Sequence, residues 1–139
     1  MRRPEEVLFV VYRPGPEFLV LLRSPERHGY WNPVAGGIEP GETLDEAALR
    51  ELGEETALTR PARLERLALE LGYRRPDSGE WITVYPYAVE ASPGWEPVLN
   101  DEHVEYRWCS AEEADRLLAY PEPRAAVTFV ARLLEVEEA

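Results

Sequence analysis

A glycine-containing loop that leads into a carboxylate-rich helix constrains this chain more than any other feature. It runs from Trp31 to Leu58 with the sequence WNPVAGGIEPGETLDEAALRELGEETAL. Thr43 followed by Glu46 is a capping box, in which a hydroxyl and a carboxylate satisfy free backbone N–H groups. The sequence therefore predicts a helix that begins at about residue 43.

The carboxylates of this helix lie beside its apolar face. At 3.6 residues per turn, Ala48, Leu49 and Leu52 share one arc, which we expect to face the core. Glu51 and Glu55 lie one turn apart at the margin of that arc. Like charges at this spacing cost about 0.2–0.5 kcal/mol on an exposed helix, and more where water is scarce. Something is therefore expected to compensate them.

A divalent cation is the expected compensation. Arg50 can reach Glu54 at i,i+4 spacing, but one guanidinium cannot neutralise three acids. Oxygen ligands without His or Cys favour Mg²⁺ or Mn²⁺ over zinc. The alternative is an acidic face that is simply solvated.

The stretch resembles the Nudix box, Gly-x5-Glu-x7-Arg-Glu-U-x-Glu-Glu-x-Gly-U, where U is aliphatic. The matching residues are Gly36, Glu42, Arg50, Glu51, Leu52, Glu54, Glu55 and Leu58. Ala57 stands where the pattern has its last glycine, and we expect this departure to alter the exit of the helix. On this resemblance the chain is identified as a member of the Nudix (MutT-like) hydrolase family.

The resemblance implies a fold, a reaction and a metal site. The fold is an α/β/α sandwich, with a mixed sheet between helices and the box helix against one sheet edge. The reaction is metal-dependent hydrolysis of a phosphoanhydride in a nucleoside diphosphate linked to another group. The implied Mg²⁺ or Mn²⁺ ligands are the carboxylates of Glu51, Glu54, Glu55 and Glu102 and the carbonyl of Ala35.

The resemblance also assigns supporting roles. Glu102 is carried over because Glu-His-x-x-Tyr-x-Trp at 102–108 looks like the acidic element that many Nudix enzymes place before a strand. Glu54 or Glu102 is the candidate general base. Arg50 is expected to assist catalysis by orienting the ligating carboxylates, together with Glu42 and with Gly36 in the loop.

Composition limits the other possibilities. A chain of 139 residues suits one domain, which we expect to span 1–139 with the box at 36–58. No apolar run approaches the roughly 20 residues needed to cross a bilayer, and the N-terminus lacks a signal-peptide cleavage site. The net charge of −12 argues against duplex nucleic acid and anionic membranes as partners. We expect a cytoplasmic protein whose one cysteine, Cys109, is a packed structural thiol.

The flanking sequence predicts the rest of the sheet. Apolar runs at 7–12 and 18–22 read as neighbouring strands, and 64–71, although ambiguous, reads as a strand in a hairpin with 81–89. Loops are expected at 23–30 and 92–101. Candidate substrate-binding residues are Arg23, Arg27 and Arg74, for which plain exposure is the alternative.

The C-terminal part predicts a strand and two helices. Val104, Tyr106 and Trp108 share one face of the strand that starts at about residue 102. Ser110 with Glu113 makes a second capping box, for a helix at about 111–119. A last helix follows Pro121 and Pro123, and its core stripe consists of Ala126, Val127, Val130, Leu133 and Leu134.

The substrate is expected to be a small nucleotide or pterin phosphate. The first predicted strand begins at about residue 7, which leaves little chain for the extra N-terminal subdomain of many nucleotide-sugar hydrolases. The Trp-x-x-Val-x-Gly entry to the box resembles the compact triphosphate pyrophosphatases, including the dihydroneopterin triphosphate type. A dinucleoside polyphosphate hydrolase and a non-catalytic nucleotide-binding module are the alternatives. The sequence leaves the oligomeric state open, with a homodimer among the choices.

Overall fold

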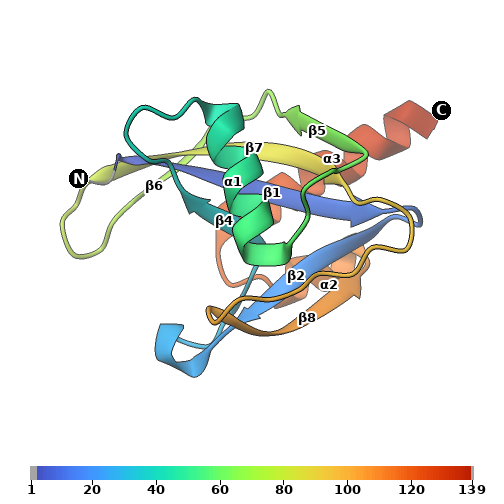
Figure 1. Cartoon of the computed structure of the whole chain (residues 1–139), viewed down its shortest axis with the longest axis horizontal. Helices are drawn as coiled ribbons and strands as arrows, with labels where there is room; N and C mark the ends of the chain where they lie inside the picture. The colour runs from blue at the N-terminus through green and yellow to red at the C-terminus, as the bar shows by residue number, and fades with distance from the viewer. Residues whose placement is uncertain (1–2, 139) are drawn as a thin grey trace.

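The computed structural model describes residues 3–138, which form a mixed sheet of eight strands with helices on both faces (Figure 1). The strands are β1 (Glu5–Arg13), β2 (Glu17–Arg23), β3 (Trp31–Asn32), β4 (Val34–Gly37), β5 (Arg63–Arg66), β6 (Leu71–Arg74), β7 (Trp81–Glu90) and β8 (His103–Cys109). The helices are α1 (Leu44–Thr56), α2 (Ala111–Leu117), α3 (Pro121–Glu138) and the short 3-10 helix η1 (Pro25–Arg27). The predicted α/β/α sandwich is confirmed.

Two long strands form the centre of the sheet. β1 and β7 run parallel, and the order β3-β2-β1-β7-β5 continues outward from them with antiparallel neighbours. β4 also pairs with β1, β6 with β7 and β8 with β2. Successive side chains of a strand point to opposite faces, so the buried run 7–12 of β1 supplies both cores. One face packs on α1 and the other on α2 and α3.

The predicted single strand at 64–71 is instead two short strands, β5 and β6. Both pair with β7, on either side of Pro86. The Pro86 carbonyl accepts a hydrogen bond from the Leu67 N–H at 2.9 Å, but proline has no N–H to return one. The ladder is interrupted at that point. The predicted hairpin with 81–89 is confirmed for β6 and β7.

Helix α1 begins as predicted, because the Thr43 and Glu46 side chains form the reciprocal capping box. Its buried face differs from the prediction. Leu49 is 47% exposed, whereas Glu55 is 5% exposed. On a wheel of 100° per residue Glu55 lies close to Ala48, so the acid occupies the centre of the buried face and not its margin.

The position of α1 on the sheet also corrects the expected edge contact. Its core cluster includes side chains from β1, β2 and β7. The helix therefore covers the middle of one face, in front of the sheet in Figure 1. On this face, the acidic side chains of the helix contact β4 and the start of β8.

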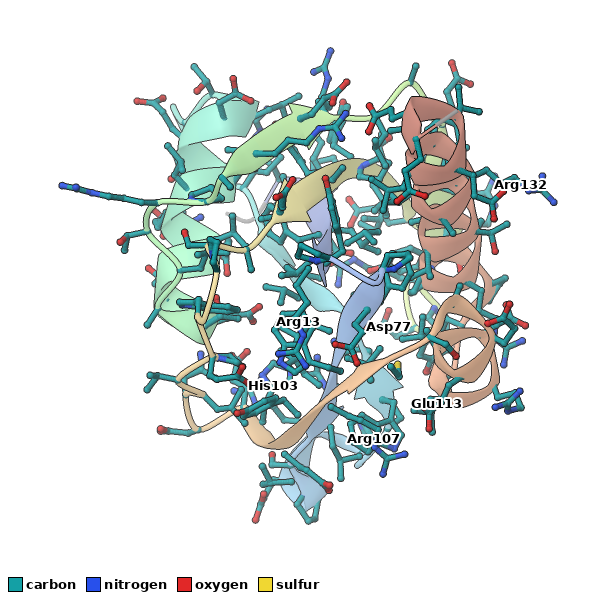
Figure 2. All side chains as sticks on the ribbon, turned by 90° about the vertical axis from the view of Figure 1, so that its right-hand side faces the viewer. Arg13, Asp77, His103, Arg107, Glu113 and Arg132 are labelled. Atoms are coloured by element: carbon teal, nitrogen blue, oxygen red, sulfur yellow. The ribbon has the colours of Figure 1, made fainter. Side chains whose placement is uncertain are left out.

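On the opposite face, α2 and α3 pack as the C-terminal sequence indicates. Ser110 caps α2 by accepting the Glu113 N–H at 3.1 Å. The Glu113 carboxylate pairs with Arg107 at 3.6 Å, on the side of the molecule that Figure 2 shows. The stripe on α3 is confirmed, with Ala126, Val127 and Val130 buried and Leu133 and Leu134 partly buried.

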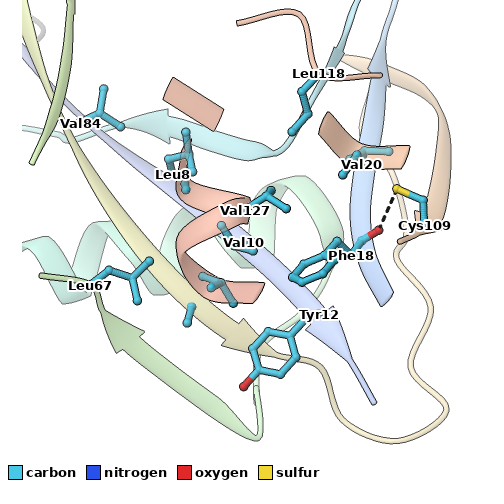
Figure 3. Close-up of a cluster of buried hydrophobic side chains, with 14 of the residues drawn as sticks. Leu8, Val10, Tyr12, Phe18, Val20, Leu67, Val84, Cys109, Leu118 and Val127 are labelled. Carbon is cyan, nitrogen blue, oxygen red and sulfur yellow. Dashed lines mark hydrogen bonds between the residues drawn. The ribbon is translucent and has the colours of Figure 1, made fainter. Parts of the chain in front are cut away.

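Cys109 closes this second core. Its thiol is 3% exposed and donates to the Phe18 carbonyl at 3.6 Å, which is the dashed contact in Figure 3. Burial raises the pKa of the thiol to about 11. A neutral, packed thiol was the predicted role, and the structure agrees.

The exit of α1 retains the geometry that glycine favours. Ala57, at the position where the box pattern has glycine, adopts φ 64° and ψ 18°, and its N–H donates to the Gly53 carbonyl at 3.0 Å. The expected change of the exit is therefore not seen. The departure costs strain, since a left-handed conformation is unfavourable by about 1–2 kcal/mol for a residue with a Cβ atom.

We predict that Ala57→Gly raises the free energy of unfolding by about 1 kcal/mol, because glycine adopts this conformation without strain. Equilibrium unfolding in urea measures the change. Ala125→Gly, on the exposed face of α3, should lower the free energy of unfolding by a similar amount. Destabilisation by both substitutions would show that Ala57 is unstrained.

Candidate active site

Two carboxylates of α1 are buried against the loop that precedes the helix. Glu51 is 9% exposed and Glu55 5%. A Cβ atom on Gly36 would come within 2.1–2.6 Å of the Glu51 carboxylate, so a side chain at this position would displace it. Glycine is needed at position 36 because an acid occupies the space beside it.

Arg50 organises the solvent side of this cluster. Its guanidinium donates to both oxygens of Glu42, at 2.7 and 2.8 Å, and to the Gly37 carbonyl at 3.0 Å. It also contacts Glu51 at 2.9 Å and Glu54 at 3.3 Å, the second of which is the predicted i,i+4 pair. The hydrogen bonds from Arg50 lower the pKa of Glu42 to about 2. One arginine thus ties the loop to the helix and fixes the direction of two acids.

A second group of ligand atoms lies deeper, between the last turn of α1 and the start of β8. A carboxylate oxygen of Glu55, one of Glu102 and a ring nitrogen of His103 all lie within 4.8 Å of one another. Burial, followed by a hydrogen bond to Glu102 and the charge of Glu51, raises the pKa of Glu55 to about 9. Burial also raises the pKa of Glu51.

This donor set fits a divalent cation. Carboxylates crowded in a site with little water require either protons or a cation, and their raised pKa values show the cost of leaving them ionised. Oxygen donors suit Mg²⁺ and Mn²⁺. The Ala35 N–H donates to Glu55 at 3.3 Å, which brings β4 next to the same carboxylate.

The sequence prediction did not include His103. The residue is next to Glu102 and opens β8, as labelled in Figure 2. Its side chain alternates with Val104 and points inward, and burial lowers its pKa to about 4. A histidine next to Glu102 at the start of a predicted strand was the available signal, but the acidic motif predicted oxygen ligands alone.

The acids line one wall of a cavity of about 690 Å³. Its lining includes Glu51, Glu54, Glu55 and Glu102, backbone near Ala35 and Gly36, the arginines Arg23, Arg27 and Arg74, and the tyrosines Tyr30, Tyr73 and Tyr120. All three predicted substrate-binding arginines therefore border the same space as the acids. Arg75, which the sequence could not separate from Arg74, is absent from the lining and pairs with Glu80 at 3.4 Å.

The cationic wall has its own contacts. Arg27 lies 3.6 Å from the Glu102 carboxylate, and the Arg23 guanidinium lies over the Tyr30 ring at 5.3 Å. Tyr30 meets Tyr120 edge to face, with ring centroids 5.2 Å apart. Carboxylate, guanidinium and aromatic groups thus line the same cavity.

Comparison with known proteins shows the family to which this fold belongs. Residues 2–132 match the family model described as NUDIX domain. The chain belongs to the Nudix hydrolase family. Two solved structures agree along most of the fold: a NUDIX hydrolase from Listeria monocytogenes (26% identity, TM-score 0.83, 97% of each chain) and the E. coli dihydroneopterin triphosphate pyrophosphohydrolase (25%, TM-score 0.78, 91% of this chain and 93% of that one).

Two of the curated relatives are named as phosphoanhydride hydrolases. The chain is 34% identical over 113 residues to the Mus musculus bis(5'-nucleosyl)-tetraphosphatase (asymmetrical), covering 80% of this chain and 76% of the relative. It is 27% identical over 128 residues to the Escherichia coli dihydroneopterin triphosphate diphosphatase, covering 84% of each. These matches make the chain a Nudix pyrophosphohydrolase.

A third relative is matched over a smaller part of its length. The Myxococcus xanthus protein named octanoyltransferase is 37% identical over 122 residues, which are 85% of this chain but 34% of that protein.

Among residues 3–138 of the Nudix chain, no helix has the length and apolar character that a membrane span requires.

We predict that Glu55→Gln stabilises the cation-free protein increasingly as the pH rises from 5 to 8. The folded-state pKa of Glu55, about 9, lies above the ordinary 4.5, so the folded state holds the proton more tightly and loses stability as pH rises through this range. Glutamine does not ionise. The difference between variant and wild type can grow by at most about 1.4 kcal/mol per pH unit.

Thermal unfolding in the presence of a chelator measures this difference. The raised pKa of Glu51 is common to both proteins, so its contribution cancels to first order. A difference in melting temperature that stays constant from pH 5 to 8 would contradict the prediction.

Proposed function

We propose that this Nudix pyrophosphohydrolase uses Mg²⁺ or Mn²⁺ to cleave a nucleoside or pterin triphosphate into a monophosphate and pyrophosphate. The observation that carries the proposal is the shared cavity, whose lining includes the carboxylates of Glu51, Glu54, Glu55 and Glu102 together with three arginines. A polyphosphate chain needs cationic partners along its length, and a protein with a net charge of −12 must supply them locally.

The residues that would hold the cation are Glu51, Glu54, Glu55 and Glu102, with the Ala35 carbonyl. When bound, a divalent cation neutralises phosphate charge, polarises the P–O bond and makes water more acidic. Arg50 and Glu42 hold Glu51 and Glu54 in place, as outer partners of ligands commonly do. Gly36 leaves the space that Glu51 occupies.

Glu54 or Glu102 would act as general base. The side chain of Glu54 is 57% exposed and that of Glu102 34%, and both border the cavity, so each can meet water there. The oxygen of that water bonds to the α-phosphorus as the bond from the α-phosphorus to the bridging oxygen breaks. Its proton passes to the carboxylate, and pyrophosphate leaves with the bonding electron pair.

The cationic and aromatic wall would bind the rest of the substrate. Arg23, Arg27 and Arg74 line the cavity and would contact phosphate, since one guanidinium group can bind two phosphate oxygens at once. Tyr30 and Tyr120 offer aromatic surface to a base or pterin ring. This combination of positive charge and aromatic surface supports a nucleotide or pterin phosphate as the substrate.

A second candidate is hydrolysis of a dinucleoside polyphosphate. The observation in its favour is the 34% identity to the mouse tetraphosphatase, against 27% to the E. coli triphosphate diphosphatase. The two candidates share the acidic wall and differ in what lies beyond the phosphates. A non-catalytic nucleotide-binding module is disfavoured because every acidic position of the box is present.

We predict that Glu55→Gln lowers kcat/KM by at least about 10²-fold, because it removes a buried charge from the proposed cation site. Glu105→Gln, on an exposed position of β8, should change it little. Steady-state assays of a triphosphate panel with Mg²⁺ measure both, and a chelator should abolish the wild-type activity. Equal losses in the two variants, or full turnover in chelator, would place the chemistry elsewhere.

We further predict that hydrolysis of the preferred triphosphate in ¹⁸O-labelled water places the label in the monophosphate, because attack occurs at the α-phosphorus. Mass spectrometry of both products measures this. Label found in pyrophosphate alone would refute attack at that atom. A tenfold higher kcat/KM for a dinucleoside tetraphosphate than for every triphosphate, equivalent to about 1.4 kcal/mol, would favour the second candidate.

A further inference from the structure

His103 is a buried imidazole whose polar atoms lack partners within the protein. It is 5% exposed, and neither ring nitrogen has a hydrogen-bond partner among residues 3–138. Buried polar side chains nearly always have a partner, because leaving one unpaired loses the hydrogen bonds it made with water. A buried and unpaired imidazole nitrogen is therefore available to bind a ligand.

The backbone holds this imidazole toward two acids. The backbone N–H of His103 donates to the Asn100 carbonyl at 3.3 Å, and the backbone N–H of Ser24 donates to the Glu102 carbonyl at 2.9 Å. Opposite His103, the pairing of β2 with β8 shifts register between Leu22 and Arg23. Such a bulge changes the direction of neighbouring side chains. The result is a ring nitrogen grouped with one oxygen each of Glu55 and Glu102.

The spacing of these atoms suits a common ion. The three ligand atoms lie within 4.8 Å of one another. Three ligands about 2.1 Å from one ion lie about 3.0–3.6 Å from one another, so closure requires a contraction of at most about 1.2–1.8 Å. Flexible glutamate side chains can supply a movement of this size.

We propose that His103, Glu55 and Glu102 form a mixed nitrogen and oxygen site for a divalent transition-metal ion, with His103 bonded directly to the metal. Imidazole binds first-row transition ions well, whereas Mg²⁺ prefers oxygen ligands alone. The enzyme would therefore bind Mn²⁺ or Co²⁺ more tightly than Mg²⁺. The inference rests on the proposed function, because Glu55 and Glu102 belong to the same acidic wall, and it adds a ligand that the acidic motif does not contain.

Pulsed electron paramagnetic resonance of Mn²⁺ bound to the full chain, without substrate, tests the bond directly. A ligating imidazole nitrogen produces a characteristic coupling to the Mn²⁺ spin. The sequence has two histidines, so His28→Asn serves as the matched control at an exposed position. We expect the nitrogen coupling in the wild type and in His28→Asn, and its loss in His103→Asn.

Titration calorimetry supplies a second readout. His103→Asn should weaken Mn²⁺ binding by at least about tenfold while Mg²⁺ binding changes by less than about threefold. His103→Gln, which offers an amide oxygen further along the side chain, is a second variant, and circular dichroism verifies that each is folded. Absence of nitrogen coupling in the wild type would overturn the proposal, as would equal weakening of Mn²⁺ and Mg²⁺.

These readouts separate the inference from the proposed function. If triphosphate is hydrolysed with Mg²⁺ but Mn²⁺ shows no coupled nitrogen, the role of His103 as a ligand is wrong and the proposed reaction stands. If the coupling is present but no phosphoanhydride in the panel is cleaved, the metal site stands and the proposed reaction is wrong.

Discussion

The burial of Glu51 and Glu55 against the sheet is the constraint on which the site depends. Two like charges on adjacent turns, shielded from water, repel each other and lose hydration, so the fold tolerates them only with compensation. Arg50 compensates Glu51 from the solvent side, and Gly36 leaves room for its carboxylate. Glu55 accepts a hydrogen bond from the Ala35 N–H, but its other neighbours include an acid and an imidazole, so its charge is compensated by a proton or a cation.

The sheet brings together segments that are distant in sequence. β1 pairs with β4, which carries Ala35 and Gly36, while β2 pairs with β8, whose start carries His103 just after Glu102. Helix α1 lies over this face of the sheet (Figure 1). Its Glu51 and Glu55 side chains contact β4 and the start of β8. The opposite core packs α2 and α3 against β1 and β2 and does not contribute to the carboxylate cluster. A precise cation site can thus rest on well-packed strands.

Local sequence signals predicted the parts of the fold that local physics decides. The capping box at Thr43 predicted the start of α1, and the continuous apolar run at 7–12 predicted strand β1, which the structure buries on both faces. The buried face of α1 was predicted wrongly, since hydrophobicity alone pointed to Leu49. The helix packs on an apolar core, but Glu51 and Glu55 on the same face meet β4 and the start of β8, and the sequence of a single helix does not reveal such partners.

The break at Pro86 and the inward position of His103 required the same tertiary information. The missing N–H of Pro86 explains the break between β5 and β6, but only the pairing of both strands with β7 shows this. Likewise, His103 is a candidate ligand only because the fold brings it next to Glu55. For the candidate site, the box motif predicted acidic ligands, and the flanking segments offered three arginines as candidates, all of which the structure brings to one cavity. Their roles in catalysis remain predictions.

Proton release on cation binding tests the central claim most directly. Titration of Mg²⁺ into the protein at pH 7.5, in buffers with different ionisation enthalpies, counts the protons displaced. Because Glu55 holds its proton at this pH in the cation-free protein, the account predicts release of about one proton per site, reduced in Glu55→Gln. Binding of Mg²⁺ without proton release would contradict a buried acid that exchanges its proton for a cation.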